Sequence, residues 1–394
     1  MQPEDRSRPL ESSSAESSND SREPVQLGLF IQPVHPPSRN YREVLQEDRE
    51  AFILADRLGY REAFVGEHLT DTSEPITSSL AFIASLVDSC AKIKFGTAVL
   101  NLAIHHPVMI AAQVAMLDQL LGGRFLLGIG PGVPWDAEAF GVLEADRNRR
   151  MLEVIDMVLA IWSKDAPYDL KGEYHSVSTT RTLRTELGQG VVVRPFQQPH
   201  PPIVVTSIRP HSEGIANAAR RGWTFISSNY VQAHCVATHL PKYLEGRAAA
   251  ALSADPSGWR VARSMFVADD EATARAYARS ETGPYGFYFR NMMTKHARIG
   301  GLYLFRAHPD QSDSEVTLEQ TLQTQVVAGT VNSVVEQLLA FREEVGPFGT
   351  LLYTGHDWAD PSLARRSMEL MATEVIPRLN DTLRRRGSQA SLMR

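Results

Sequence analysis

The chain contains 394 residues, of which 43% are hydrophobic and 22% are charged, ordinary proportions for a soluble globular protein. Its 46 acidic and 40 basic side chains give a net charge of −6, which argues against broad non-specific binding to nucleic acid. The two cysteines, Cys90 and Cys235, are too few for a disulfide scaffold or a zinc site built from cysteines.

Both ends of the chain have the composition of tails. Residues 1–24 are polar and serine-rich and contain no aromatic residue, so we expect them to be disordered. Residues 384–394 predict a second loose tail, which leaves 25–383 as one folded domain. The start has no hydrophobic signal core, and no apolar run reaches the roughly 20 residues needed to cross a bilayer. We therefore expect a cytoplasmic protein with no membrane partner.

Between the tails, short apolar runs alternate with stretches of helical periodicity. The first four strand–helix pairs are 25–32 with 41–58, 63–66 with 75–90, 93–100 with 107–120, and 124–129 with 147–162. The next four are 202–206 with 212–221, 224–227 with 233–250, 259–267 with 270–281, and 350–354 with 361–379. Eight successive pairs predict an α/β fold, a closed (β/α)8 TIM barrel, in preference to a doubly wound sheet.

Two segments interrupt this alternation. Residues 171–195, after helix four, predict a polar β-hairpin, and residues 282–330, after helix seven, form a long aromatic-rich insertion. We interpret the second insertion as a lid over an apolar substrate, although ordinary packing of a loop against the barrel explains it equally well.

Barrels of this kind place their active sites at the carboxyl ends of the strands. Glu67 and His68 follow the second strand, where a lone histidine is a satisfied polar group about as often as a catalyst. No zinc-ligand spacing accompanies them, so no metal site is predicted. Gly130, Pro131 and Gly132 follow the fourth strand, where missing side chains let a ligand lie against the backbone or simply permit a tight turn.

The loop after the fifth strand has the composition of an anion site. Ser207, His211 and Ser212 lie between this strand and the next helix, where serine caps the helix or the open N–H groups bind phosphate. Arg149 and Arg150 on the fourth helix are candidate countercharges, with an exposed basic residue as the simpler interpretation of each.

Five segments, taken together and in order, resemble the bacterial luciferase-like family of flavin-dependent monooxygenases, and in particular its limonene monooxygenase-like branch. They are LGLFIQPVHP, LADRLGYREAFVGEH, KIKFGTAVLNLAIHHPVMIAAQVAMLDQLLGGRFLLGIGPG, RPHSEGIANAARRGW and FGTLLYTGHDWADPSLARRSMELMATEVIP. Each segment alone is a loose match, but the ordered set is specific and covers residues 25–379.

The resemblance implies a monooxygenase that uses reduced FMN supplied by a separate NAD(P)H:flavin reductase, whereas other family members use a deazaflavin. It implies that reduced flavin and oxygen form a C4a-peroxide that attacks the substrate. His68 matches the catalytic histidine of the family's Glu-His motif, with Glu67 before it. Leu69 replaces the second histidine of that motif, so light emission from an aldehyde is not implied. Family members are commonly dimers, and a homodimer is therefore expected.

The resemblance also assigns residues to the cofactor. Ala98 and Val99 match the place of a non-proline cis peptide under the flavin ring, and Gly130 stands where the family can carry a reactive cysteine. Of the two arginines, Arg149 is the preferred match to the phosphate arginine. The full cofactor-binding set is Ala98, Val99, Gly130, Pro131, Gly132, Arg149, Ser207, His211 and Ser212.

The sequence shows no cluster of convergent charges of the kind that would indicate a strongly ionic substrate. A terpene, ketone, aldehyde or polycyclic natural product is compatible with the apolar side chains near the strand ends. The candidate substrate-pocket residues are Phe30, Trp135, Phe140, Phe287, Met292 and Trp358.

Three other functions stay open at this point. The first is a deazaflavin-dependent oxidoreductase on the same barrel, without oxygen insertion. The second is a non-catalytic flavin-binding partner subunit, against which the retention of Glu67 and His68 argues. The third is a barrel hydrolase that pairs Glu67 with Asp136 or Asp357.

Overall fold

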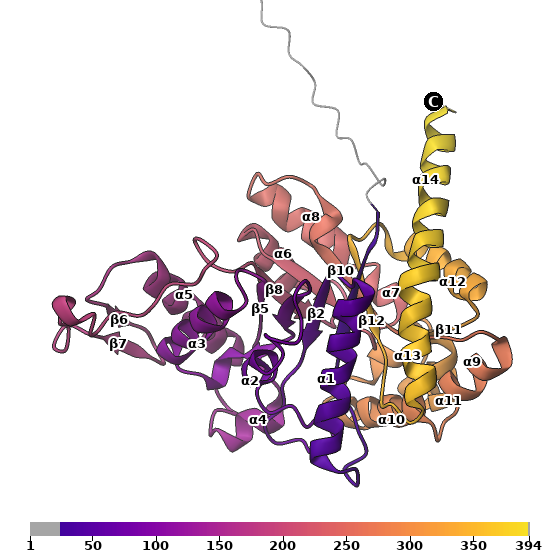
Figure 1. Cartoon of the computed structure of the whole chain (residues 1–394), viewed down its shortest axis with the longest axis horizontal. Helices are drawn as coiled ribbons and strands as arrows, with labels where there is room; N and C mark the ends of the chain where they lie inside the picture. The colour runs from indigo at the N-terminus through magenta and orange to yellow at the C-terminus, as the bar shows by residue number, and fades with distance from the viewer. Residues whose placement is uncertain (1–23, 393–394) are drawn as a thin grey trace, which may run out of the picture.

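A computed structural model describes residues 24–392, and its core is a closed barrel of parallel strands surrounded by helices (Figure 1). The eight barrel strands are β1 (Gln26–Ile31), β2 (Glu62–Val65), β3 (Lys94–Thr97), β5 (Phe125–Gly130), β8 (Ile203–Ser207), β9 (Thr224–Ser227), β10 (Trp259–Val267) and β12 (Thr350–Thr354). β12 pairs in parallel with β1 on one side and with β10 on the other, which closes the barrel. The prediction of a TIM barrel is confirmed.

Four short strands lie outside this set. β4 (Leu100–Asn101) pairs with β5, and β6 (Asp169–Lys171) and β7 (Ser176–Ser178) form the antiparallel hairpin predicted after the fourth barrel helix, although it begins two residues earlier than expected. β11 (Val326–Gly329) pairs in parallel with the end of β10, inside the segment that the sequence predicts to be an insertion.

The helices keep the predicted order. They are α1 (Tyr41–Leu58), α2 (Ser79–Ala84), α3 (Pro107–Leu120), α4 (Pro134–Ala139), α5 (Arg147–Ser163), α6 (Glu213–Arg220), α7 (Ala233–Val236), α8 (His239–Ala249), α9 (Glu271–Ala278), α10 (Pro284–Ala297), α11 (Leu318–Gln325), α12 (Val331–Val345), α13 (Pro361–Leu370) and α14 (Ile376–Leu392). The bounds of α1 and α3 agree with the sequence prediction. Asn40 caps the start of α1 by accepting two backbone N–H groups, and Gly59 ends it in the left-handed conformation that favours glycine.

Two helices differ from the sequence prediction. α2 is much shorter than the expected 75–90, because the Ser78 side chain caps its start and the Ser85 hydroxyl donates to the Phe82 carbonyl at its end. α12 was not predicted, although its buried apolar residues follow a helical spacing.

The expected loose tail from residue 384 is helical as far as Leu392. Arg384 pairs with Asp381 one turn earlier in α14, and Arg386 pairs with Glu343 of α12. The expected tail at the other end, 1–24, lies outside the described residues except for Pro24.

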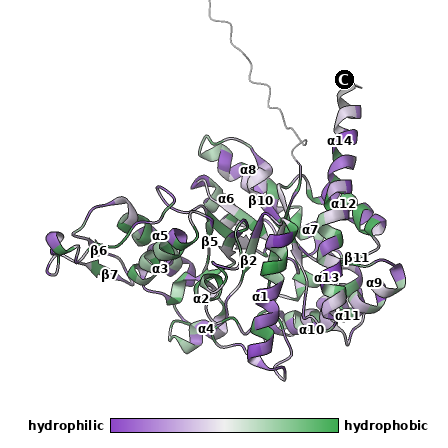
Figure 2. Cartoon of the chain, in the orientation of Figure 1, coloured by the Kyte–Doolittle hydropathy of each residue, from purple (hydrophilic) through white to green (hydrophobic). Residues whose placement is uncertain are grey.

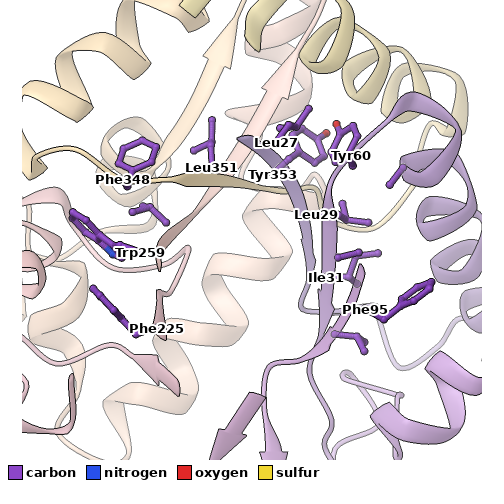
Figure 3. Packing of buried hydrophobic residues seen from close by; sticks show 14 of the residues in the cluster. Leu27, Leu29, Ile31, Tyr60, Phe95, Phe225, Trp259, Phe348, Leu351 and Tyr353 are labelled. Atoms are coloured by element: carbon purple, nitrogen blue, oxygen red, sulfur yellow. The ribbon is translucent and has the colours of Figure 1, made fainter. Parts of the chain in front are cut away.

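Side chains of the barrel strands alternate between two apolar clusters. Leu27, Leu29 and Ile31 of β1 point outward toward the helices, as do Leu351 and Tyr353 of β12 (Figure 3). The intervening residues point inward and fill the barrel; they are Phe30, Phe64, Leu126, Val204, Ile226, Ala262 and Leu352. Figure 2 shows the complementary pattern in the surrounding helices, where α1 alternates between hydrophilic and hydrophobic residues.

A buried ion pair closes the amino-terminal end of the barrel interior. Arg260 donates to both carboxylate oxygens of Glu62, at 2.6 and 3.1 Å, and its guanidinium lies 5.5 Å from the ring centre of Phe64. Paired charges and an aromatic ring fill this end, so we look for the functional site at the carboxyl end of the barrel.

A second charge network joins the loop after β1 to the loop after β12. The ring of His35 contacts Asp357 at 2.6 Å and Asp48 of α1 at 3.1 Å, and Arg39 pairs with both Glu47 and Asp357. Histidine and carboxylates at such spacing are metal-ligand types, but the Arg39 guanidinium already supplies the positive charge here. Burial alone lowers the pKa of His35, but its two carboxylate partners outweigh burial and raise it to about 10.

We expect Asp357→Asn to lower the free energy of unfolding by about 2–4 kcal/mol, because it removes the one carboxylate that both His35 and Arg39 contact and leaves each cation with a single carboxylate partner, Asp48 or Glu47. The matched control is Asp269→Asn, which breaks an exposed pair with Arg366 and should cost less than about 1 kcal/mol. Urea unfolding of both variants tests this, and equal costs would contradict it.

The same network predicts a pH dependence. The contribution of His35 to the free energy of unfolding is fully present below its pKa in the unfolded chain, about 6.5. It is lost as the pH rises toward about 10, the pKa of His35 in the folded protein. The stability difference between the wild type and His35→Gln should therefore shrink between these two pH values.

Candidate functional site

The candidate site lies at the carboxyl end of the barrel. In Figure 1, α4 and α10 lie on the lower side of the barrel. Strand ends from β1, β2, β9, β10 and β12 supply polar side chains that meet residues of these two helices.

Glu67 anchors two other segments of the chain at this end. Its Oε2 accepts the Ser79 N–H at 3.0 Å and the Ser79 hydroxyl at 2.7 Å, and its Oε1 accepts the Asn101 N–H at 3.1 Å. Burial alone raises the pKa of Glu67, but these donors and His105 outweigh it, so the net pKa is lowered. Glu67 is thus a charged anchor for the backbone on either side of it.

His68 is held by a carboxylate through one ring nitrogen. Its Nε2 lies 3.1 Å from Glu74 Oε2, and its ring faces the Trp135 ring with 6.2 Å between centres. Its Nδ1 is buried and has no hydrogen-bond partner within residues 24–392; the nearest carboxylate oxygen, on Asp136, is 3.9 Å away. Nδ1 is therefore the one nitrogen of His68 that has no hydrogen-bond partner in the described part of the chain.

Glu74 lies at the centre of a polar network that sequence reasoning missed. Lys295 of α10 donates to Glu74 Oε1 at 2.6 Å, and Gln32 after β1 donates to Oε2 at 3.2 Å. Burial alone raises the pKa of Glu74, but the charges of His68 and Lys295 outweigh it and hold the pKa well below its usual range. The only sequence signal for Lys295 is that it is the single lysine of the aromatic-rich insertion.

From Gln32 the hydrogen bonds continue across the barrel end. Tyr288 donates to Gln32 Oε1 at 2.7 Å, and Asn229 donates to both Tyr288 at 2.8 Å and Ser264 at 3.0 Å. The Ser264 hydroxyl lies 3.0 Å from His356 Nε2. Burial lowers the pKa of His356 to about 3, so this histidine is neutral.

The peptide bond between Ala98 and Val99 is cis, which confirms that prediction. At two nearby positions, Gly128 and Gly130, the neighbouring chain leaves no room for a side chain. A Cβ on Gly128 would lie 1.6 Å from the Thr97 carbonyl oxygen, and one on Gly130 would lie 2.4 Å from a Val99 methyl. Gly132 alone of the three has positive φ, at +73°.

The loop before α6 has an open helix start. Ser212 is the N-cap residue, but its side chain makes no capping hydrogen bond, and His211 before it has φ of +51°. This loop is held in place from behind, because Thr238 accepts the His211 N–H at 2.8 Å and His239 contacts the Arg209 carbonyl at 2.9 Å.

The remaining predicted cofactor residues lie nearby or at the surface. Ser207 is buried at the end of β8. Arg149 is exposed and pairs with Glu173 at 2.9 Å, whereas Arg150 donates to the Ala103 carbonyl and lies over the Tyr174 ring.

Of the predicted substrate residues, Trp135 and Met292 lie with His68 and Gln32, since the Met292 sulfur accepts from Gln32 at 3.4 Å. Phe30 is buried inside the barrel, and Phe287 packs against the outer apolar core.

Two of these predictions need correction. Phe140 ends α4 with 48% of its surface exposed, and Trp358 lies under the Arg365 guanidinium beside Glu47, in the His35 network. Phe140 is exposed because it follows the last residue of a six-residue helix whose buried face is Asp136 and Ala137.

The hydrolase alternative lacks a free carboxylate pair. Asp136 accepts the backbone N–H groups of Leu69 and Thr70 and the Thr70 hydroxyl, and Asp357 is engaged by His35 and Arg39. With Glu67 also engaged, all three proposed carboxylates serve as structural acceptors.

No helix of the described residues is long and apolar enough to cross a membrane. A family model described as luciferase-like monooxygenase matches residues 25–347. The chain is 29% identical over 366 residues to 4-hydroxyprotoasukamycin monooxygenase of Streptomyces nodosus subsp. asukaensis, which covers 92% of this chain and 94% of the relative. It is 28% identical over 361 residues to limonene 1,2-monooxygenase of Rhodococcus erythropolis, which covers 91% and 88%.

A solved structure is also similar. The oxygenating constituent of 3,6-diketocamphane monooxygenase from Pseudomonas putida, determined in complex with FMN, matches with a TM-score of 0.81 at 25% identity. The match covers 90% of this chain and 98% of that one.

Proposed function

Because the chain belongs to the luciferase-like monooxygenase family, we propose that it is the oxygenating component of a two-component enzyme. It would use reduced FMN, delivered by a separate NAD(P)H:flavin reductase, and dioxygen to oxygenate an apolar small molecule. The observation that carries this proposal is the buried, unpartnered Nδ1 of His68 at the carboxyl end of a barrel that matches the family over 25–347. The FMN bound to the similar diketocamphane enzyme supports the choice of cofactor.

The residues at this end fit a flavin. The uncapped start of α6 offers backbone N–H groups and the Ser212 hydroxyl to a phosphate, with Ser207, His211 and Arg149 as its proposed neighbours. Ala98 and Val99, with the loop Gly130–Gly132, would lie against the ring system. When bound, reduced FMN supplies the electrons that activate dioxygen.

The protein's own residues would orient the reactants and exclude water. His68 presents Nδ1 as a hydrogen-bond donor, while Glu67 fixes the backbone around it. α10 covers this end of the barrel with Tyr285, Tyr288 and Phe289, all buried. This burial supports the insertion as a fixed cover, and we propose that it shields the reaction from solvent.

We propose that the substrate contacts Trp135 and Met292 beside His68. Both side chains are largely apolar, and together with Phe30 in the barrel interior they favour a hydrophobic molecule over an ionic one. The relatives are named for limonene and diketocamphane oxygenation, which agrees with a terpene or a ketone as substrate class.

An exposed apolar stripe on α3 supports a homodimer. Met109, Met116 and Leu120 are each more than half exposed and share one helix face. Phe196, also exposed, continues the patch, because Gly123 after α3 lies against its ring. A contiguous exposed apolar patch of this kind is typical of an interaction surface, and we propose that a second copy covers it.

Turnover with labelled oxygen tests the proposed function. We expect the chain, with FMN, NADH and a generic flavin reductase, to transfer one atom of ¹⁸O₂ into a cyclic terpene or bicyclic ketone, as read by mass spectrometry. His68→Ala should reduce product formation by about 10²–10⁴-fold while FMN binding stays nearly intact. Turnover with a reduced deazaflavin and no oxygen incorporation would favour the dehydrogenase alternative, and normal turnover by the variant would remove His68 from the mechanism.

Ser212→Asp tests the phosphate position separately. Aspartate is a good N-cap residue, so thermal stability should be kept or raised, but its charge should weaken FMN binding by at least about tenfold. Ser212→Asn is the matched neutral control. Unchanged FMN affinity in the aspartate variant, measured by fluorescence quenching, would place the phosphate elsewhere.

Sedimentation equilibrium tests the dimer surface. Met116→Glu should convert the dimer to monomer by burying an unpaired charge in the contact. Leu187→Glu, at an exposed position on the hairpin insertion, is the control and should leave the mass unchanged. A monomeric wild-type chain would contradict the proposal.

A further inference from the structure

We propose that Glu74 is a positioning residue that keeps His68 as a doubly protonated imidazolium, and that the charge of Lys295 on α10 moderates this effect. His68 would then act through its Nδ1–H as a cationic hydrogen-bond donor and not as a base. This inference deepens the proposed function of the same site and rests on it for the catalytic consequence alone.

The geometry determines which nitrogen does what. His68 Nε2 lies 3.1 Å from Glu74 Oε2, so this nitrogen carries a proton that it donates to the carboxylate. Nδ1, on the other side of the ring, is buried and unpartnered within the described chain. If His68 were neutral, Nδ1 would be a bare acceptor, whereas the imidazolium presents an N–H there.

The charges around His68 come from three elements. Glu74 and Asp71 lie on the loop after β2, Asp136 lies on α4, and Lys295 lies on α10. His296 of α10 is the remaining titratable group near Glu74 on that helix, and burial lowers its pKa to about 4, so it is neutral.

Of the tyrosines packed around Glu74, Tyr230 after β9 and Tyr288 of α10 have pKa values raised by burial and stay uncharged. The immediate balance is therefore three carboxylates against Lys295, and a positive charge on His68 brings the cluster closer to neutrality.

The pKa directions agree with this geometry. Burial alone lowers the pKa of His68, but the charge and hydrogen bond of Glu74 outweigh it, and the net pKa is raised. Lys295 opposes that rise, while it supports the ionised form of Glu74. Glu74 and Lys295 thus act on His68 in opposite directions, which gives a test that general loss of structure cannot imitate.

The insertion takes on a specific task in this proposal. Lys295 bonds to Glu74 at 2.6 Å and also pairs with Asp71, and Asn291 one turn earlier donates to Ser73 at 3.2 Å. α10 therefore clamps the 71–74 loop that carries the partner of His68. The cover over the barrel end and the charge state of the histidine are set by the same helix.

The first arm of the test is independent of turnover. In ligand-free protein labelled with [¹³Cε1]histidine, the His68 resonance, assigned by its loss in His68→Gln, should titrate above the ordinary histidine range. Glu74→Gln should move this titration to lower pH, Lys295→Met should move it to higher pH, and Glu74→Asp should restore part of the wild-type value. Glu138→Gln, an exposed carboxylate on α4, is the control and should leave the titration unchanged.

The second arm uses turnover. The alkaline limb of the kcat profile should follow the same order, so that Glu74→Gln loses on the order of tenfold in kcat between pH 6 and pH 8 where the wild type loses little. Shifts of the resonance in the same direction for both charge-removing variants, or a wild-type His68 that titrates in the ordinary range, would overturn the proposal. An intact resonance order with no oxygenation would leave this inference standing and refute the proposed function instead.

Discussion

The carboxylate of Glu74 is charged in a place almost closed to water, and the arrangement of the barrel's carboxyl end follows from the need to pair it. An isolated buried carboxylate would take up a proton, and Glu74 stays ionised because His68 and Lys295 approach it from two sides. One of these partners comes from the end of β2 and the other from α10. The pairing therefore joins an early strand of the barrel to the insertion near the end of the chain. It also leaves Nδ1 of His68 without a hydrogen-bond partner in the described residues.

Two histidines of this end, His68 and His356, illustrate how the environment gives the same side chain different pKa values. His68 has a carboxylate on Nε2 and a raised pKa, whereas His356 has the Ser264 hydroxyl on Nε2, an aromatic neighbour in Tyr288 and a pKa of about 3. Hydrogen bonds through Gln32, Tyr288 and Asn229 connect them. The amino-terminal end of the barrel, in contrast, is filled by the Glu62–Arg260 ion pair, whose role is structural. This separation of a stabilising end from a chemical end is general for barrels of this type.

Local pattern was enough for most of the fold. Helical periodicity predicted α1, which Gly59 ends, and α3, which has Pro107 in its first turn. Eight strand–helix pairs were enough to predict a closed barrel. Two features were missed because long-range contacts determine them. β11 is a strand through its pairing with β10, and α14 continues past residue 384, where Arg386 pairs with α12. Periodicity within one segment does not contain those contacts.

The site was only half accessible from sequence. His68 and the cis bond at Ala98–Val99 follow from strand ends and the family resemblance, but Glu74 lies in a loop with no motif, and Lys295 is more than 220 residues away along the chain. The aromatic composition of the insertion suggested an apolar lid and gave no sign that α10 brings the charge of Lys295 to the site. Phe140 and Trp358 failed for the converse reason, because a large apolar residue near a strand end can as easily face solvent or a neighbouring ion pair.

The most direct test of the account is a structure of the protein crystallised with FMN. The account predicts FMN at the carboxyl end of the barrel, with its phosphate at the start of α6 beside Ser212 and its ring system against Ala98–Val99 on the side that His68 Nδ1 faces. FMN bound at any other part of the molecule, or a ring system that makes no contact with Nδ1 of His68, would contradict it.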